Sequence, residues 1–284
     1  MKEFKGKVAV ITGGANGLGL AIAEEAIRRD MKVVIADICK DGLKEADKRF
    51  KDMNADFITL FADVTKYDEM EMIADKTIEK YGQVDILFNN AGVVIPGSIY
   101  NLPLNDIEYI MQSNVYSILY GMKVFIPIME KQGTDCHVVN TASVAGLLTT
   151  SGMPTYHMTK FANVGLTESV NYELQEKGSN VKMSIFCPGF IQTKLHLCDD
   201  RRPERFEIDS DNPYYSSDEY KAGLKRAEHV ITTGIPIDSV GMSVFQAIED
   251  EQFYILTHPQ YQPVIGWRVK NILDMKNPDI NFFK

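Results

Sequence analysis

The chain has 284 residues, 45% of them hydrophobic, which is enough to bury one large core. Its formal net charge of −9 argues against a nucleic-acid partner, because affinity for a phosphate backbone depends on clustered Lys and Arg. No apolar run reaches about 18 residues and the amino terminus has no apolar signal core, so we expect neither a membrane span nor an export signal.

Apolar strand-like runs alternate with helical patterns along the chain, which predicts an α/β fold. We expect a doubly wound, Rossmann-type three-layer sandwich with a central parallel sheet of about seven strands. The predicted strands are 7–12, 32–37, 56–61, 84–88, 136–141, 181–187 and 253–257. The predicted helices are 17–29, 41–51, 66–80, 104–131, 155–177 and 237–249.

A glycine-rich loop joins the first predicted strand to the first predicted helix. Glycines let the backbone turn tightly and approach a pyrophosphate, while the following helix offers free N–H groups to it. A ligand-free tight turn is the alternative, but strand, loop and helix form the context that a dinucleotide fingerprint requires. We therefore expect cofactor contacts from Gly13, Asn16, Gly17, Leu18 and Gly19.

The second predicted strand ends in an acidic residue, Asp37. A carboxylate at this place accepts hydrogen bonds from the adenosine ribose hydroxyls and repels a 2′-phosphate, so it favours NAD over NADP. Lys40 lies close by in the sequence and would weaken this preference. A helix cap or a solvated strand end is the alternative role for Asp37.

Tyr156 and Lys160 are four residues apart in a predicted helix and therefore share one face, with Ser143 shortly before them. A phenol has a pKa of about 10, and a neighbouring ammonium group is expected to lower it. A Ser hydroxyl would bind the substrate oxygen. This set is suited to moving a proton on or off an alcohol or carbonyl.

The four cysteines, at positions 39, 136, 187 and 198, form no C-x-x-C pair, which fits a reduced cytoplasm better than a disulfide framework. The five histidines show no metal-binding spacing, so we expect no metal site. His157 adjoins Tyr156 but points in another direction on a helix, and we interpret it as a packing or surface residue.

Together these motifs resemble the short-chain dehydrogenase/reductase family in its single-domain, NAD(P)-dependent form, over about residues 5–258. The markers are Thr12-Gly-x-x-x-Gly17-x-Gly19, Asp63-Val64, Asn89-Asn90-Ala91-Gly92, Asn114, Ser143, Tyr156-x-x-x-Lys160 and Pro188-Gly189 with Thr193. The resemblance implies a single dinucleotide-binding and catalytic domain over 1–263.

The resemblance also implies a role for each matching residue. Asp63 would receive the adenine amino group, Val64 would pack nearby, and Asn90, Ala91 and Gly92 would lie along the cofactor. Asn114 would hold a water on Lys160 and complete a catalytic tetrad with Ser143 and Tyr156, while Lys160 would bind the nicotinamide ribose. The nicotinamide carboxamide would be positioned by Pro188, Gly189, Ile191 and Thr193. Read singly, each polar residue has an ordinary alternative, such as a helix cap for Asp63 or Thr193.

The segment 194–234 is the most irregular part of the chain. The resemblance suggests a substrate lid, and a long surface insert packed on the domain is the alternative. The expected substrate contacts are Ser143, Ala145, Leu147, Met153, Tyr156 and Leu195. Because these walls are mostly apolar, we expect a bulky hydrophobic secondary alcohol or ketone, including hydroxysteroid-like compounds.

The extension 264–284 carries a short apolar face. We expect this extension either to contribute to a homodimer or homotetramer or to fold back on its own domain.

Two rival functions remain open beside an NAD-dependent dehydrogenase. One is an NADPH-dependent carbonyl or ketoacyl reductase, against which Asp37 argues. The other is a non-catalytic dinucleotide sensor, which would have no need for an intact tetrad. A sugar epimerase or dehydratase is less compatible, because the chain leaves little length for a second lobe.

Overall fold

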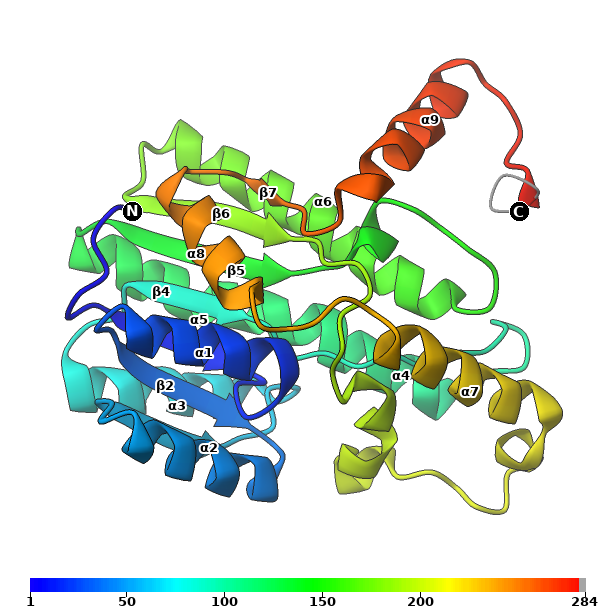
Figure 1. Cartoon of the computed structure of the whole chain (residues 1–284), viewed down its shortest axis with the longest axis horizontal. Coiled ribbons are helices and arrows are strands. Elements are labelled where there is room, and N and C mark those ends of the chain that lie inside the picture. Colours follow the sequence, from blue (N-terminus) through cyan, green and yellow to red (C-terminus); the bar gives the residue numbers. More distant parts are fainter. Residues whose placement is uncertain (281–284) are drawn as a thin grey trace.

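The computed structural model describes residues 1–280, and its centre is a sheet of seven parallel strands in the order β3-β2-β1-β4-β5-β6-β7 (Figure 1). The strands are β1 (Val8–Thr12), β2 (Lys32–Asp37), β3 (Phe57–Phe61), β4 (Ile86–Asn89), β5 (Cys136–Thr141), β6 (Val181–Phe186) and β7 (Tyr254–Ile255). The expected doubly wound α/β fold with a seven-stranded parallel sheet is thereby confirmed.

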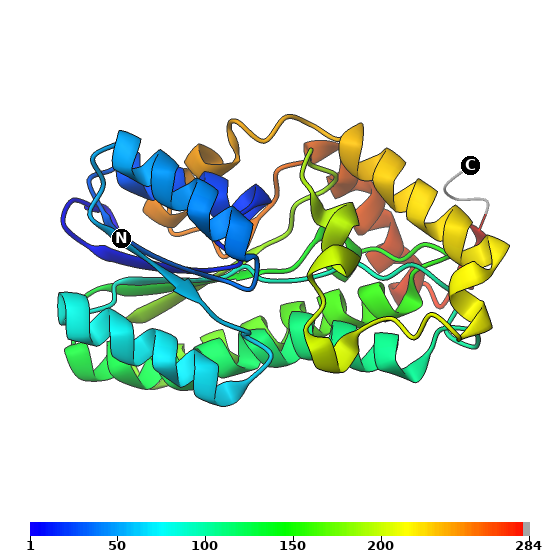
Figure 2. The ribbon, with the colours of Figure 1, turned by 90° about the horizontal axis from the view of Figure 1, so that it is seen from below.

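Helices cover both faces of the sheet, which is why its strands are almost continuously apolar (Figure 2). In β1, Ala9 and Ile11 join the core under one helical layer, whereas Val8 and Val10 join the core under the other. One layer contains α1 (Gly17–Arg28), α2 (Lys40–Asp52) and α8 (Val240–Glu249); the other contains α3 (Tyr67–Tyr81), α5 (Ser117–Gln132) and α6 (Pro154–Glu176).

The strand order reverses between β1 and β4, and sheets of this kind open a crevice at that point beyond the strand ends. The Thr12 hydroxyl joins the two strand ends by accepting the backbone N–H groups of Asn90 at 3.0 Å and Ala91 at 3.2 Å. The Asn90 amide group returns hydrogen bonds to the carbonyls of Thr12 at 3.1 Å and Gly13 at 3.2 Å. These hydrogen bonds therefore fix the backbone at the base of the crevice.

Three elements differ from the prediction. The helix expected over 104–131 is divided into α4 (Leu104–Met111) and α5 by a π-helical turn, η1 (Gln112–Tyr116). The last strand is shorter than the predicted 253–257 and consists of the two residues of β7. A helix that was not predicted, α7 (Asp218–Thr232), starts at Ser217, whose hydroxyl accepts the N–H of Tyr220. Only two residues of α7 are buried, Ala227 and Ile231.

The segment 194–234 lies beyond the carboxyl ends of the strands and is more ordered than its sequence suggests (Figure 1). It contains three short 3-10 turns, η3 (Leu195–Arg201), η4 (Glu204–Phe206) and η5 (Pro213–Ser216), followed by α7. Its aromatic residues pack on one another and on Tyr109 of α4, for example Phe206 at 5.2 Å between ring centroids. This packing matches the surface-insert alternative that the sequence left open beside a substrate lid.

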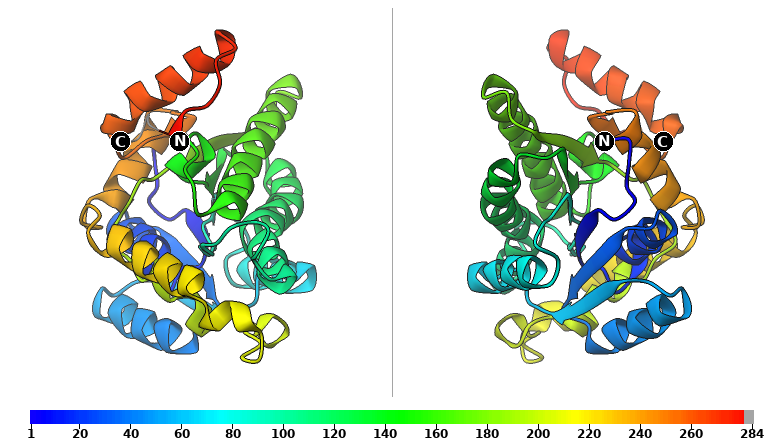
Figure 3. Two further views of the ribbon diagram at one scale, coloured as in Figure 1. Left: turned by 90° about the vertical axis from the view of Figure 1, so that its right-hand side faces the viewer. Right: turned by 90° about the vertical axis from the view of Figure 1, so that its left-hand side faces the viewer.

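The last described helix, α9 (Gln262–Leu273), projects from the body and buries none of its residues (Figures 1 and 3). Its visible anchor is Arg268, whose guanidinium lies 4.8 Å from the ring centroid of Phe161 on α6. Across residues 1–280, every helix is too short or too polar to span a bilayer.

Candidate active site and dinucleotide cleft

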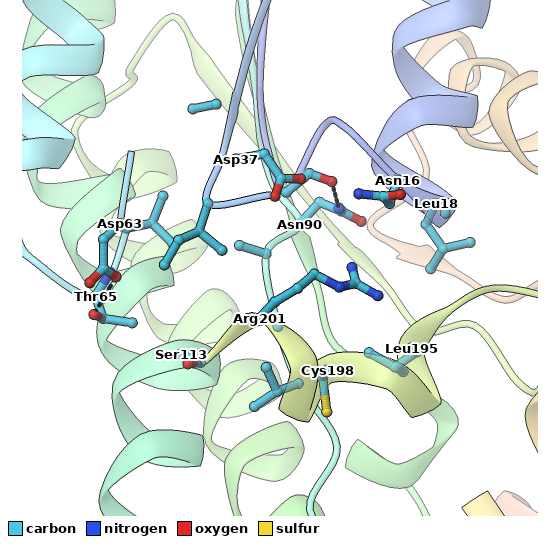
Figure 4. A pocket seen from close by; sticks show the side chains of 18 of the residues that line it. Asn16, Leu18, Asp37, Asp63, Thr65, Asn90, Ser113, Leu195, Cys198 and Arg201 are labelled. Atoms are coloured by element: carbon cyan, nitrogen blue, oxygen red, sulfur yellow. Dashed lines mark hydrogen bonds between the residues drawn. The ribbon is translucent and has the colours of Figure 1, made fainter. Parts of the chain in front are cut away.

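The crevice at the strand-order reversal is a cleft bounded by the glycine loop, the ends of β2, β3 and β4, and η3 (Figure 4). Most of the residues that the sequence assigned to cofactor binding line it. They are Gly13, Asn16, Gly17, Leu18, Asp37, Asp63, Val64, Asn90, Ala91, Gly92 and Thr193. The structure also places there several residues that sequence analysis missed, namely Thr65, Tyr109, Ser113, Cys198 and Arg201.

The glycine loop needs its glycines for two different reasons. Gly13 and Gly17 have φ angles of +62° and +49°, and a Cβ on Gly13 would stand 2.9 Å from the Cα of Ala91. Gly19 does not line the cleft, because a Cβ there would lie 2.2 Å from the carbonyl oxygen of Gly13, inside the loop itself. The loop therefore leaves a bare backbone surface at the start of α1, which fits a dinucleotide pyrophosphate.

Asp37 is buried at the end of β2 and faces the cleft. Its carboxylate accepts the N–H of Ala15 at 3.0 Å and the N–H of Cys39 at 2.9 Å, so it also fixes the loop. Burial raises the pKa of Asp37, while these backbone N–H groups and the guanidinium of Arg201 oppose that shift. Lys40 lies elsewhere, with its ammonium 4.8 Å from the ring centroid of Phe61.

Asp63 is buried after β3, and both of its oxygens have partners. One oxygen accepts the hydroxyl of Thr65 at 2.5 Å and its N–H at 3.1 Å, but Asp63 does not cap α3, whose N-cap residue is Lys66. The other lies 2.7 Å from a guanidinium nitrogen of Arg205, which comes from the 194–234 segment. Sequence analysis did not predict Arg205 at this end of the cleft, because the two residues are far apart along the chain.

Ser143, Tyr156 and Lys160 come together next to the cleft. Ser143 precedes the 3-10 turn η2 (Val144–Gly146), and its hydroxyl accepts the N–H of Ala145 at 3.1 Å. Lys160 is buried, with its ammonium 5.6 Å from the ring centroid of Tyr156 and 3.1 Å from the carbonyl oxygen of Thr141. The phenol of Tyr156 is within hydrogen-bonding reach of Ser143.

The acidities of this pair differ from the prediction. Burial raises the pKa of Tyr156 to about 12, although hydrogen bonding with Ser143 opposes the shift. Burial also lowers the pKa of Lys160 to about 8, against a smaller raising effect of Cys187. The predicted lowering of the phenol pKa by the ammonium is therefore wrong for the free protein, because loss of solvent favours the neutral form of both groups.

Asn114 lies in the middle of η1 and is fully buried. Its amide group spans the backbone of Val93, accepting the N–H at 2.8 Å and donating to the carbonyl at 3.0 Å, and it also donates to Thr159 at 3.1 Å. A Cβ on Gly92 would lie 3.1 Å from the Asn114 oxygen and 3.7 Å from the Lys160 ammonium. The π-turn thus brings Asn114 to the same place as Lys160, as π-bulges often do at functional sites.

The turn after β6 is held by His258, whose role was not visible in the sequence. The N–H of Gly189 donates to Nδ1 of His258 at 3.0 Å, and a Cβ on Gly189 would stand 2.6 Å from that ring. Nε2 of the same histidine lies 3.1 Å from the carbonyl of Phe190. His258 therefore fixes the turn from the far end of the chain.

The other residues of this turn approach the tetrad and the glycine loop. The carbonyl of Pro188 accepts the Ser143 hydroxyl at 3.3 Å. Ile191 forms an isolated parallel bridge with Ile235, which ties both ends of the 194–234 segment together. Thr193 lies next to the glycine loop, because a Cβ on Gly17 would be 3.4 Å from the Thr193 side chain.

The expected substrate residues do not all gather around Tyr156. Leu195 packs in the same apolar cluster as the Tyr156 ring, whereas Leu147 packs with the buried group that includes Ile185 and Cys187. Met153 precedes α6 and is half-buried. The carbonyl of Ala145 pairs with Nδ1 of His157 at 3.0 Å. His157 is thus a buried packing residue, as predicted.

Within the described part of the chain, no group of three or more His, Cys, Asp or Glu side chains is arranged to hold a metal ion. The four cysteines are free thiols. Burial raises the pKa of Cys136 to about 11 and the pKa values of Cys187 and Cys198 to about 12.

Known proteins agree with this arrangement. A family model described as "short chain dehydrogenase" matches residues 7–201. A Lactiplantibacillus plantarum protein named "CLA biosynthesis dehydrogenase/reductase" is 46% identical over 281 residues, covering 99% of this chain and 98% of that protein. A Streptomyces avermitilis protein named 1-deoxy-11-beta-hydroxypentalenate dehydrogenase is 26% identical, covering 91% of this chain and 87% of that protein.

Among solved structures, a short-chain dehydrogenase/reductase from Burkholderia phymatum in complex with NAD superposes with a TM-score of 0.94. It is 35% identical, and the match covers 98% of both chains. Fold, cleft and sequence likeness extend over nearly the whole chain, so this protein is an NAD(P)-dependent oxidoreductase that belongs to the short-chain dehydrogenase/reductase family.

Proposed function

We propose that this enzyme interconverts a secondary alcohol and a ketone and that it prefers NAD to NADP. The observation that carries the proposal is the buried set of Ser143, Tyr156 and Lys160 beside a cleft that fits a dinucleotide. Asn114 stands next to this set at Gly92 and completes the proposed tetrad.

The proposed chemistry is a proton transfer on the substrate oxygen, coupled to hydride transfer on the carbon that bears it. A bound nicotinamide supplies or accepts the hydride. In the reductive direction Ser143 and Tyr156 hydrogen-bond the carbonyl oxygen, and Tyr156 donates its proton as negative charge grows there. At neutral pH the buried phenol, whose pKa burial raises to about 12, carries the proton that the reduction requires. Lys160 stabilises the phenolate that remains.

The NAD preference is supported by Asp37, a carboxylate at the ribose end of the cleft. Lys40 does not offset it, because that ammonium lies over Phe61. Arg201 favours a second candidate, an NADPH-dependent carbonyl or ketoacyl reductase, since it brings positive charge into the same cleft. Titration of the protein with NADH and NADPH separates the two.

We propose a hydrophobic substrate, because the surroundings of Tyr156 are apolar. Val93, Val94, Ile95 and Leu195 belong to the cluster on which its ring packs. The first compounds to test are the substrate of the Lactiplantibacillus plantarum relative, whose name places it in CLA biosynthesis, and hydroxysteroid-like alcohols. The name of the Streptomyces avermitilis relative, a dehydrogenase of a hydroxylated compound, agrees with alcohol oxidation.

The decisive experiment is a panel of secondary alcohols and ketones with NAD(H) and NADP(H), followed at the nicotinamide absorbance. With the best substrate, Tyr156→Phe is expected to lower kcat by about 10²–10⁴-fold, since general acid catalysis is lost, while NADH still binds. His157→Gln, a change at its neighbour, serves as a control for helix integrity. Near-normal turnover by Tyr156→Phe would reject the mechanism. Binding of NADH without turnover of any substrate would favour the non-catalytic sensor.

We further propose that residues 1–263 act as one catalytic domain with 194–234 as its substrate lid, and that the protein is a cytoplasmic homodimer or homotetramer. The lid is supported by the packing of Leu195 near Tyr156, and the compartment by the four free thiols.

A further inference from the structure

Three arginines follow one another closely in the lid, and each has a different environment. Arg202 is almost fully buried and pairs with Asp106 of α4 and, at 2.7 Å, with Asp199. Arg205 pairs with Asp63 at 2.7 Å and donates to the Thr65 hydroxyl. Arg201 makes no ion pair with any of residues 1–280, and its one hydrogen bond is to the carbonyl of Lys194 at 2.8 Å.

The direction of Arg201 follows from the anchoring of its neighbour. Asp106 also accepts the Tyr215 hydroxyl at 3.0 Å, and Asp199 accepts the Tyr220 hydroxyl at 3.0 Å, so the carboxylates that hold Arg202 are themselves held. With Arg202 fixed toward α4, Arg201 points the other way. Figure 4 shows its side chain reaching from η3 across the cleft toward Asn16 and Leu18.

The start of α1 opposite Arg201 is also short of negative charge. Asn16 makes no side-chain cap, and the first turn of α1 carries no acidic residue. The helix N-terminus therefore keeps free N–H groups, which face the cleft through Gly17 and Leu18. These two positive groups on opposite walls leave a place for an anion between them, in a cleft whose lining also includes the carboxylates of Asp37 and Asp63.

We propose that Arg201 binds the pyrophosphate of the dinucleotide from the lid side, opposite the glycine loop. A guanidinium offers several donors in a planar fork that matches phosphate oxygens. The inference rests on the proposed dinucleotide site. It adds that the lid is also a cofactor-binding element, and that a bound cofactor holds η3 in place.

This arrangement connects cofactor binding to the substrate end of the site. Leu195 and Cys198 lie on η3 with Arg201, and both belong to the apolar cluster that contacts Tyr156. When the pyrophosphate holds Arg201, it also holds the wall against which the substrate is positioned. A substrate that enters after the cofactor therefore meets an assembled wall.

The test compares dissociation constants of the whole protein and of Arg201→Gln for four probes: NADH, NADPH, ADP and 2′-AMP. We expect Arg201→Gln to bind NADH and ADP about 10–100-fold more weakly, the loss typical of a charged hydrogen bond to a buried ligand, and to bind 2′-AMP unchanged. The matched control is Arg226→Gln, which removes the same charge from the exposed face of α7. Equal melting temperatures show that both variants fold.

Three outcomes overturn the inference. Unchanged affinity of Arg201→Gln for NADH and ADP would show that Arg201 does not contact the pyrophosphate. A loss confined to NADPH and 2′-AMP would assign Arg201 to a 2′-phosphate instead and would support the reductase alternative. Failure of the wild-type protein to bind any dinucleotide would overturn the proposed function along with this inference, so the two failures are distinguishable.

Discussion

At the scale of single residues, the buried ammonium group of Lys160 lowers the free energy of unfolding of the protein. Its ammonium is buried, with a backbone carbonyl as its hydrogen-bond partner, and its pKa is lowered to about 8. Lowering the pKa from 10.5 to that value corresponds to a destabilisation of about 3 kcal/mol at neutral pH. The residue proposed to stabilise the Tyr156 phenolate therefore destabilises the free protein.

We predict that Lys160→Met abolishes turnover but raises the unfolding free energy by on the order of 2 kcal/mol at pH 7. Between pH 8 and 10.5 the unfolded wild-type chain binds more protons than the folded one, so wild-type stability rises with pH and the advantage of the variant disappears. Denaturant unfolding at pH 7 and pH 10 measures this. A pH-independent difference between the two proteins would contradict the prediction.

Asp37 is neither the helix cap nor the solvated strand end that the sequence left as alternatives, because Cys39 caps α2 and Asp37 is buried. It binds the loop backbone at Ala15 and Cys39 and it also faces the cleft. We predict that Asp37→Asn, which retains some of these contacts, lowers the ratio of NADH to NADPH affinity by about tenfold or more, since it removes the repulsion of a 2′-phosphate. Fluorescence titration measures both constants, and a constant ratio would contradict the assigned role.

At the scale of elements, the features that depend on local sequence patterns could be predicted from the sequence. The buried strands, the glycine loop and the position of Tyr156 and Lys160 on one helix follow from apolar runs and helical spacing. The π-turn at Asn114 did not follow, because the residues that stabilise it, Val93 and Thr159, are distant in sequence. The anchoring of Gly189 by His258 depends on β7 pairing with β6 and was equally invisible.

Gly121 on α5 and Gly165 on α6 differ in how closely their neighbours pack against them. A Cβ on Gly121 would lie 2.0 Å from the Asn89 side chain at the end of β4, whereas a Cβ on Gly165 would meet nothing within 4 Å. We predict that Gly121→Ala destabilises the protein by about 1–3 kcal/mol and that Gly165→Ala stabilises it by about 0.5–1 kcal/mol. Chemical denaturation of both variants gives the comparison, and equal effects would contradict the packing.

At the scale of the whole molecule, α9 projects from the body and buries none of its residues. Ile272 and Leu273 are exposed, and Met275 follows them. If the protein is an oligomer held through this helix, Leu273→Asp is expected to reduce the mass measured by light scattering while leaving the melting temperature of the subunit nearly unchanged. Met242→Asp, on the exposed face of α8, is the matched control. An unchanged mass for Leu273→Asp would exclude α9 as the interface.

The thiol of Cys198 has a consequence for experiments on this protein. It is buried within η3 and donates to the carbonyl of Val94 at 3.2 Å, whereas Cys187 is fully buried directly after β6, where its N–H donates to the carbonyl of Ile255 at 2.8 Å. Because Cys198 lines the cleft, we predict that a local movement of η3 exposes it to an alkylating reagent, whereas the fully buried Cys187 requires a larger opening of the structure. The two alkylation rates, read side by side by mass spectrometry, would therefore report local opening and larger opening in the native chain, without an engineered label.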